Sequence, residues 1–577
     1  YKDIKNENGE NERRLINKGY YFKDSYTELY EANIPPILRY FHITEISPSG
    51  WVSLPNSKVE HITGINKTTT CDFEFVIKYK DIIALNEKET SIQYDIGSVD
   101  IEAGSSHGDF PVPIKSYKKL ATNIVDYFEK KGDVNINKEE CKDILKEIIK
   151  NAFGYDGNTM PGIDLVYPKK NINGEVESRT EKWLKTKVRD RVVNSEEHLI
   201  EAAFENAYKV LNKAVETERH ENDGDSDSDD ETNEVIEPKE YKISSGFNGA
   251  DTYKDKESTI VDVINDKGFS REGKINELSL SLRSNFPQLE GDKVTFIGST
   301  FWKYGEKEPY LNHCVCLDTC SNIPNAKIES YKTEREVLLN WTKIIQKEDP
   351  DIVIGYNIFG FDFSFIYHRA DELGILGRLG TLGRMKGKET VLEEKNLSSS
   401  ALGENILTYL NMEGRVSMDL LKVVQKDHKL VSYKLDTVAE TFISGSIKEI
   451  NGNKLKIDGG KDLNIGNYIA IFMKNDKYLE GQKFKILDIK GGVITLSEDI
   501  ADIIEKKPSW RLAKDDIGPK DIFRLQKGDA EDRKIVATYC IQDCALCNKL
   551  INKLSIISNN IGMANVCSVP LSYIFLR

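Results

Sequence analysis

Two acidic residues, Asp100 and Glu102, lie two positions apart in a run of apolar residues. On a β-strand, residues two apart point to the same face, so these two carboxylates would project together. The flanking Val99 and Ile101 would then face a hydrophobic core. Because Mg²⁺ prefers oxygen ligands, the pair is a candidate for part of a magnesium site.

Two further segments place acidic groups where catalytic residues collect. Asp362 ends the segment Gly355–Asp362, which follows the short apolar run Ile352–Ile354. Such a run is typical of a buried strand, and catalytic groups in α/β sheets gather beyond the carboxyl ends of strands. Tyr539 and Asp543 lie four residues apart in a helical pattern, so they share one helix face.

Together these segments predict a two-metal nuclease site. Its predicted ligands are Asp100, Glu102, Asp362 and Asp543. Two Mg²⁺ ions (or Mn²⁺ in their place), roughly 3.5–4 Å apart, can activate a water and stabilise the departing oxygen in phosphodiester cleavage. Tyr539 is a poor base because a phenol with a pKa of ~10 is protonated at neutral pH, so we expect it to orient the attacking water.

The elements that must position these groups alternate between strands and helices. The patterns predict strands over 92–103, 294–301, 313–317 and 352–354, and helices over 333–347, 363–373 and 530–557. The first of these helices opens with Thr333 and Glu336, the spacing of a capping box. This alternation predicts a mixed α/β domain over residues 91–577.

Two segments interrupt that domain. Residues 116–285 contain apolar residues at helical spacing, which predicts a helical insertion that includes a helix over 199–215. Within it, residues 216–240 hold twelve acidic and two basic residues, a local charge of −10 that predicts a disordered loop. Residues 446–512 show short strand patterns separated by glycines, which predicts a small β-barrel insertion.

Composition and length bound the class of protein. A chain of 577 residues is too long for one core, and we expect a loose lead-in over 1–28 and a β-rich N-terminal domain over 29–90. No apolar run is long enough to span a bilayer, so no membrane partner is expected. Nine scattered cysteines favour reduced thiols and an intracellular location. Outside the acidic loop the net charge is only −4, which neither supports nor excludes DNA binding.

Several residues have a less specific interpretation. Cys314, Cys316 and Cys320 could bind a metal ion, but we favour simple packing because the sequence offers no fourth ligand nearby. Cys540, Cys544 and Cys547 have the spacing of one buried helix stripe. His107 could contact DNA, and an exposed loop residue is the preferred interpretation.

Three motifs resemble those of the exonuclease domain of family-B DNA polymerases. The first is Asp100-Ile-Glu102 followed by 108–111, the second is 350–362, and the third is Tyr539-x-x-x-Asp543. The resemblance implies a ribonuclease-H-like domain that removes mispaired 3′ nucleotides. It also implies that Asn357 and Phe361 bind DNA.

The surrounding segments are similar to delta-type polymerases, and the long insertions resemble those of large DNA viruses. These segments are 38–40, 50–51, 414–419, 433–435 and 569–573. The resemblance implies as partners a single-stranded DNA 3′ end, a primer–template, the palm domain of the same polypeptide and a sliding clamp. For a virus, the location would be the host nucleus or a cytoplasmic viral factory.

The polymerase motifs of the same family, Asp-x-x-Ser-Leu-Tyr-Pro-Ser and Tyr-Gly-Asp-Thr-Asp-Ser, do not occur in the sequence. The expectation is therefore that the chain is the N-terminal and exonuclease part of a replicative polymerase, without palm, fingers and thumb. The alternative is a non-catalytic module that binds DNA and braces the palm. We favour the enzyme because all four acidic residues are present.

Overall fold

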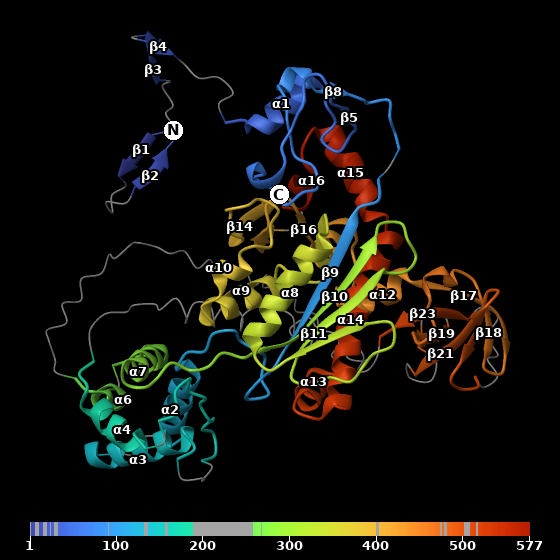
Figure 1. Cartoon of the computed structure of the whole chain (residues 1–577). Coiled ribbons are helices and arrows are strands. Elements are labelled where there is room, and N and C mark those ends of the chain that lie inside the picture. The colour runs from blue at the N-terminus through green and yellow to red at the C-terminus, as the bar shows by residue number, and fades with distance from the viewer. Residues whose placement is uncertain are drawn as a thin grey trace, which may run out of the picture.

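The computed structural model gives the protein as a mixed α/β fold with separate helical and β-barrel parts (Figure 1). It describes residues 2–5, 11–14, 20–23, 25–27, 33–90, 92–131, 137–155, 160–172, 174–188, 258–266, 268–399, 403–473, 476–477, 482–500, 508–514 and 517–576. The predicted helix over 199–215 and the predicted acidic loop over 216–240 lie outside the described residues.

Among the described residues, six strands form the central sheet, in the order β12-β11-β10-β9-β13-β16. These strands are β9 (Asp95–Ala103), β10 (Val294–Lys303), β11 (Leu311–Leu317), β12 (Lys327–Tyr331), β13 (Ile352–Gly355) and β16 (Val416–Asp419). Strand β10 is antiparallel to β9 and β11, whereas β13 is parallel to both β9 and β16. This mixed sheet confirms the expected ribonuclease-H-like fold.

Helices cover both faces of the sheet. On one face, Val99 and Ile101 of β9 share a core with residues of α8 (Glu334–Glu348) and α9 (Asp362–Glu372). On the other face, α14 (Ala530–Lys553) packs against β9 and β10. Because strand side chains alternate, Asp100 and Glu102 point to the α14 face, as predicted. The predicted capping box at Thr333 is also present.

Close packing of α14 on the sheet depends on Gly298. This glycine pairs with Asp100 across the β9–β10 ladder. Its backbone N–H donates to Cys540 Sγ of α14 at 3.2 Å, and a Cβ at residue 298 would lie 2.8 Å from that sulfur. The missing side chain therefore lets the helix that carries Tyr539 and Asp543 approach the strand that carries Asp100 and Glu102.

The remaining elements of the α/β part lie between or after the strands of the central sheet in the chain. They are α10 (Leu376–Leu379), β14 (Val391–Ser399), β15 (Gly403–Asn411), α11 (Leu420–Asp427), α12 (Leu435–Phe442), α13 (Pro519–Gln526), α15 (Ile556–Cys567) and α16 (Leu571–Phe575). The last long helix is shorter than predicted: α14 ends at Lys553, and Ser555 has a left-handed backbone (φ 52°) before α15 begins.

The helical part has its own core and lies away from the sheet (Figure 1). Its described helices are α2 (Lys118–Lys130), α3 (Lys138–Ala152), α4 (Val176–Lys185), α6 (Ile260–Asn265) and α7 (Arg271–Asn285). Ile144, Leu145 and Ile148 of α3 are buried, as their helical spacing predicted.

The barrel follows α12 and lies beside α14 (Figure 1). Its strands are β17 (Ser444–Asn451), β18 (Lys454–Ile457), β19 (Tyr468–Met473), β20 (Asp476–Lys477), β21 (Lys483–Lys490), β22 (Val493–Leu496) and β23 (Ser509–Ala513). Strand β23 pairs with both β17 and β19, which closes the barrel. Large apolar side chains such as Phe484 and Trp510 fill the interior, so it is a packed core.

The described residues of the N-terminal part form short two-stranded pieces and one α-helix. The strands are β1 (Lys2–Lys5), β2 (Asn11–Arg14), β3 (Tyr20–Phe22), β4 (Ser25–Thr27), β5 (Val52–Ser53), β6 (Glu60–His61), β7 (Phe75–Val76) and β8 (Ile83–Ala84). A loose lead-in was expected over 1–28, where the described residues include strands β1–β4, and a β-rich domain over 29–90. Residues Pro36–Thr44 form helix α1, which begins with proline at its first turn. Among the described residues, no helix has the length and apolar character needed to cross a membrane.

Candidate active site

A tight turn between β13 and α9 delivers Asp362 to the sheet. Gly355 ends β13, where a Cβ would lie 2.5 Å from the Val99 carbonyl oxygen, so only glycine fits. Asn357 follows with a left-handed backbone (φ 62°), which asparagine tolerates better than most residues. The buried carboxylate of Asp419 accepts hydrogen bonds from the backbone N–H groups of Asn357 (2.9 Å) and Phe359 (3.0 Å). Asp419 therefore fixes the turn.

Asp362 lies against the strand that carries the first acidic pair. Its Oδ1 accepts a hydrogen bond of 3.0 Å from the backbone N–H of Ile101, the residue between Asp100 and Glu102. Asp362 is only 4% exposed. The second segment is thus attached directly to the first, as the sequence predicted.

Helix α14 brings Tyr539 and Asp543 to the same place, together with a lysine that the sequence analysis missed. Lys514 Nζ donates to the Tyr539 hydroxyl at 2.5 Å and to Asp543 Oδ2 at 2.6 Å. Lys514 directly follows the last barrel strand, β23. No spacing motif marks Lys514, because it lies 25 and 29 residues before its partners Tyr539 and Asp543 in the chain.

Burial and mutual repulsion dominate the electrostatics of these carboxyl groups. Burial, followed by the charges of Asp543 and Asp362, raises the pKa of Asp100 well above its usual value. Burial raises the pKa of Glu102 to about 8, of Asp362 to about 7 and of Asp543 to about 6. Lys514 opposes this effect for Asp543, and the pKa of Lys514 is itself raised by the nearby acidic groups. Full ionisation of these four carboxyl groups at neutral pH therefore requires a compensating positive charge.

The donor set fits a divalent cation in type and charge. Asp543 Oδ1 is buried and has no hydrogen-bond partner, while Oδ2 is held by Lys514. An oxygen left in this state is costly unless a cation or donor meets it. In the described part of the chain, no three acidic, histidine or cysteine side chains already have the spacing of a metal site. Ion binding at these carboxylates thus stays a prediction that requires side-chain adjustment.

The raised pKa values predict that the metal-free protein loses stability as the pH rises. The stability that this raised pKa contributes is fully present below the unfolded value of ~4, and it is lost as the pH rises through the folded value of Glu102, about 8. Calorimetry in EDTA should show a melting temperature that falls from about pH 5 to about pH 8. Asp100→Asn with Glu102→Gln should flatten that fall, and an equally steep fall in this variant would contradict the assignment.

An aromatic pair lies next to Asp362. The ring of Phe361 contacts the ring of Phe110 at a centroid distance of 5.3 Å. Phe361 is a predicted DNA-binding residue, and Phe110 belongs to the 108–111 segment of the first motif. Asn357, the other predicted DNA-binding residue, lies in the same turn, where its amide oxygen is close to Gly360.

Comparison with known proteins shows which family the chain belongs to. A family model described as "DNA polymerase family B, exonuclease domain" matches residues 27–209 and 233–438. The chain belongs to this family. The match includes the strand with Asp100 and Glu102 and the turn with Asp362, but it ends before the barrel and α14.

Individual relatives of this exonuclease-domain family are viral and cellular. A DNA polymerase of Pyramimonas orientalis virus is 37% identical over 95% of this chain and 41% of its own length. A DNA polymerase of Phaeocystis pouchetii virus is 35% identical over 99% of this chain and 56% of its own length. The DNA polymerase delta catalytic subunit of Arabidopsis thaliana is 29% identical over 51% of this chain and 21% of its own length. The chain thus spans about half the length of its viral relatives.

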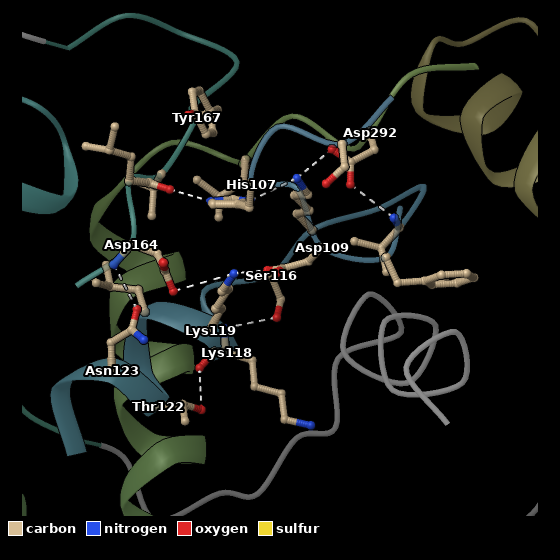
Figure 2. Close-up of a pocket in the computed structure, with 18 of the residues that line it drawn as sticks. His107, Asp109, Ser116, Lys118, Lys119, Thr122, Asn123, Asp164, Tyr167 and Asp292 are labelled. Atoms are coloured by element: carbon tan, nitrogen blue, oxygen red, sulfur yellow. Dashed lines mark hydrogen bonds and ion pairs between the residues drawn. The ribbon is translucent and has the colours of Figure 1, made fainter. Parts of the chain in front are cut away.

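In this protein, the loop between β9 and α2 contacts the helical part (Figure 2). His107 makes a hydrogen bond to the Leu165 carbonyl and an edge contact with the Tyr167 ring. Lys119 of α2 forms ion pairs with Asp109 of the loop and with Asp164. His107 is thus partly buried, and the expectation of an exposed loop residue is wrong. The junction lines an open pocket of about 580 Å³.

The cysteine cluster is a packing feature of the same domain. Cys314 and Cys316 are buried on β11 with their sulfurs 3.7 Å apart. The structure brings Cys540 of α14 next to Cys314, so a fourth thiol is nearer than the sequence indicated. These thiols belong to one apolar cluster with Phe296 and Val536. No metal-binding group is found there among the described residues.

Proposed function

We propose that this chain hydrolyses DNA from the 3′ end, as the proofreading exonuclease of a replicative polymerase. The observation that carries the proposal is the meeting of β9, the Asp362 turn and α14 around one buried acidic cluster. Asp100, Glu102, Asp362 and Asp543 would hold two Mg²⁺ ions, with Mn²⁺ as a substitute. When bound, such ions supply a deprotonated water and neutralise charge on the reacting phosphate.

The residues around the cluster have separate roles in this proposal. A lysine ammonium only donates hydrogen bonds, so the Tyr539 oxygen accepts from Lys514 and its own O–H remains to donate. Tyr539 would thereby orient the attacking water or a phosphate oxygen. Lys514 would hold both Tyr539 and Asp543 in place. The rings of Phe361 and Phe110 offer a stacking surface for the terminal base.

The proposal extends to the organisation of the protein. Residues 29–90 would form the N-terminal domain and 91–577 the exonuclease domain, interrupted by 116–285 and 446–512. DNA synthesis would belong to the palm of a longer polypeptide, with primer–template DNA and a sliding clamp as partners, inside an infected cell. The lengths and names of the viral relatives support this reading.

The test is a labelled primer–template incubated with magnesium, with and without deoxynucleoside triphosphates. We expect shortening of the 3′ end with release of mononucleotides. Single strands and mispaired ends should be digested faster than matched ends, because unpairing a base costs a few kcal/mol and least at a mismatch. Primer extension by this chain is not expected.

The alternative is a non-catalytic module that binds DNA and braces the palm. The intact set of carboxylates argues against it. Binding of single strands without any magnesium-dependent shortening would favour this alternative over the nuclease.

A further inference from the structure

A groove of about 680 Å³ lies between α14 and the barrel. Its lining includes Lys514 and Asp543, so the groove is continuous with the acidic cluster. Figure 1 shows the barrel beside α14 and next to the β10–β11 hairpin. The groove therefore has one wall from the exonuclease core and one from the barrel.

Side-chain contacts fix the barrel wall against the core wall. Lys549 of α14 donates to Asn467 Oδ1 of the barrel at 3.1 Å. The amide of Asn464, in the same barrel loop, donates to Glu308 of the β10–β11 turn at 3.5 Å. Hydrogen bonds between polar side chains therefore hold the two walls of the groove together.

The charges in the groove suit a polyanion. Three lysines line it, Lys307, Lys514 and Lys549, against the acidic Glu308 and Asp543. Lys549 is partly buried, and this burial lowers its pKa to about 8. A phosphate next to Lys549 would favour its charged form, which burial disfavours. The aromatic ring of Tyr468 also lines the groove and could stack on a base.

The aromatic pair and the groove involve different residues of the acidic cluster. Phe361 precedes Asp362, whereas the groove is lined by Asp543 and Lys514. A phosphodiester held at the carboxylates would therefore have the stacking pair at Asp362 and the groove at Asp543. A strand needs room on both sides of its scissile phosphate.

We propose that this groove binds the DNA strand adjoining the scissile phosphate, so that the barrel forms one wall of the substrate channel. This inference rests on the proposed nuclease function and deepens it. The family match ends at residue 438, before the barrel begins at Ser444. The channel wall is thus supplied by a part of the chain outside the matched region.

The test compares Lys307→Met with Lys549→Met, singly and together. The probe is a short fluorescein-labelled oligo(dT) in EDTA, and its anisotropy gives the affinity at several salt concentrations. The double variant should bind about tenfold more weakly, and its log–log salt slope should fall by about 1.4, since each phosphate contact contributes ≈ 0.7 for single strands. Lys307 is exposed, so its single variant tests the groove without disturbing the fold.

The matched control is Lys553→Met. Lys553 lies one turn beyond Lys549 on α14 and pairs with Asp462 of the barrel at 3.4 Å, but it does not line the groove. Its affinity and salt slope should match those of the parent chain. Parent-like binding by the double variant overturns the proposal. The proposal is also overturned if the double variant binds the strand as the parent does but is inhibited differently by a deoxynucleoside monophosphate. The groove would then hold the product. If the parent chain shortens no DNA, the nuclease function fails, while the affinity comparison still decides the groove.

Discussion

Replacing Asp100 and Glu102 with alanine should lower magnesium-dependent shortening of single-stranded DNA by at least about a thousandfold, or roughly 4 kcal/mol of transition-state stabilisation. The reason is geometric. Both carboxylates project from β9 to the face that meets α14, and the backbone between them is held by Asp362. Removing the pair leaves only two of the four predicted ligands. Single-turnover digestion of a labelled oligonucleotide measures the loss.

The variant should nevertheless fold. The two carboxyls are buried and repel their neighbours, so their loss relieves repulsion in the metal-free protein. Its melting temperature in EDTA should be no lower than that of the parent. Glu531→Ala serves as the control, since Glu531 is an exposed carboxylate in the first turn of α14 and should leave the rate unchanged. Substantial magnesium-dependent cleavage by the purified double variant would sink the assignment.

The parts of the site that were predictable depend on local periodicity. Asp100 and Glu102 share a face because strand side chains alternate, and Tyr539 shares a helix face with Asp543 because of the helical repeat. The sheet and the closed barrel were also predictable, because buried strands are apolar and glycines separate short strands. These signals are contained within a few residues of each other.

The parts that were not predictable come from contacts between distant segments. Lys514 reaches Tyr539 only because β23 closes the barrel and returns the chain to α14. Asp419 holds the turn at Asn357 from a strand 62 residues further along the chain. Nothing in the local sequence around either residue marks such a role. The same is true of His107, whose partner Leu165 lies in the helical part.

Local periodicity does not define where some elements begin and end, because the chain conformation there depends on a single position. The β-rich description of residues 29–90 did not include helix α1, which Pro36 begins because proline fits the first turn of a helix. Ser555 interrupts the last helix with a left-handed backbone that no helical repeat foretells. Periodicity identifies the element but not where it stops.

Lys514→Met should reduce the rate of DNA shortening by about 10²–10³-fold, the range found when one positioned donor is removed from an active site. Lys514 donates to both Tyr539 and Asp543, so its loss frees the tyrosine hydroxyl and leaves both oxygens of Asp543 without a partner. Methionine keeps an unbranched apolar side chain but removes the ammonium, which lies 4.0 Å from the centroid of the Tyr539 ring. The rate is measured in single turnover across a pH series.

If Lys514 did not act through these carboxylates, its removal would leave the pH–rate profile unshifted. Loss of the ammonium removes the charge that lowers the pKa of Asp543 and Glu102. The acidic limb of the pH–rate profile should therefore move to higher pH in Lys514→Met, while substrate affinity changes less than the rate. Lys520→Met is the control, since Lys520 lies exposed on α13. An unshifted profile in Lys514→Met, or an equal loss of rate in Lys520→Met, would show that Lys514 does not act through these carboxylates.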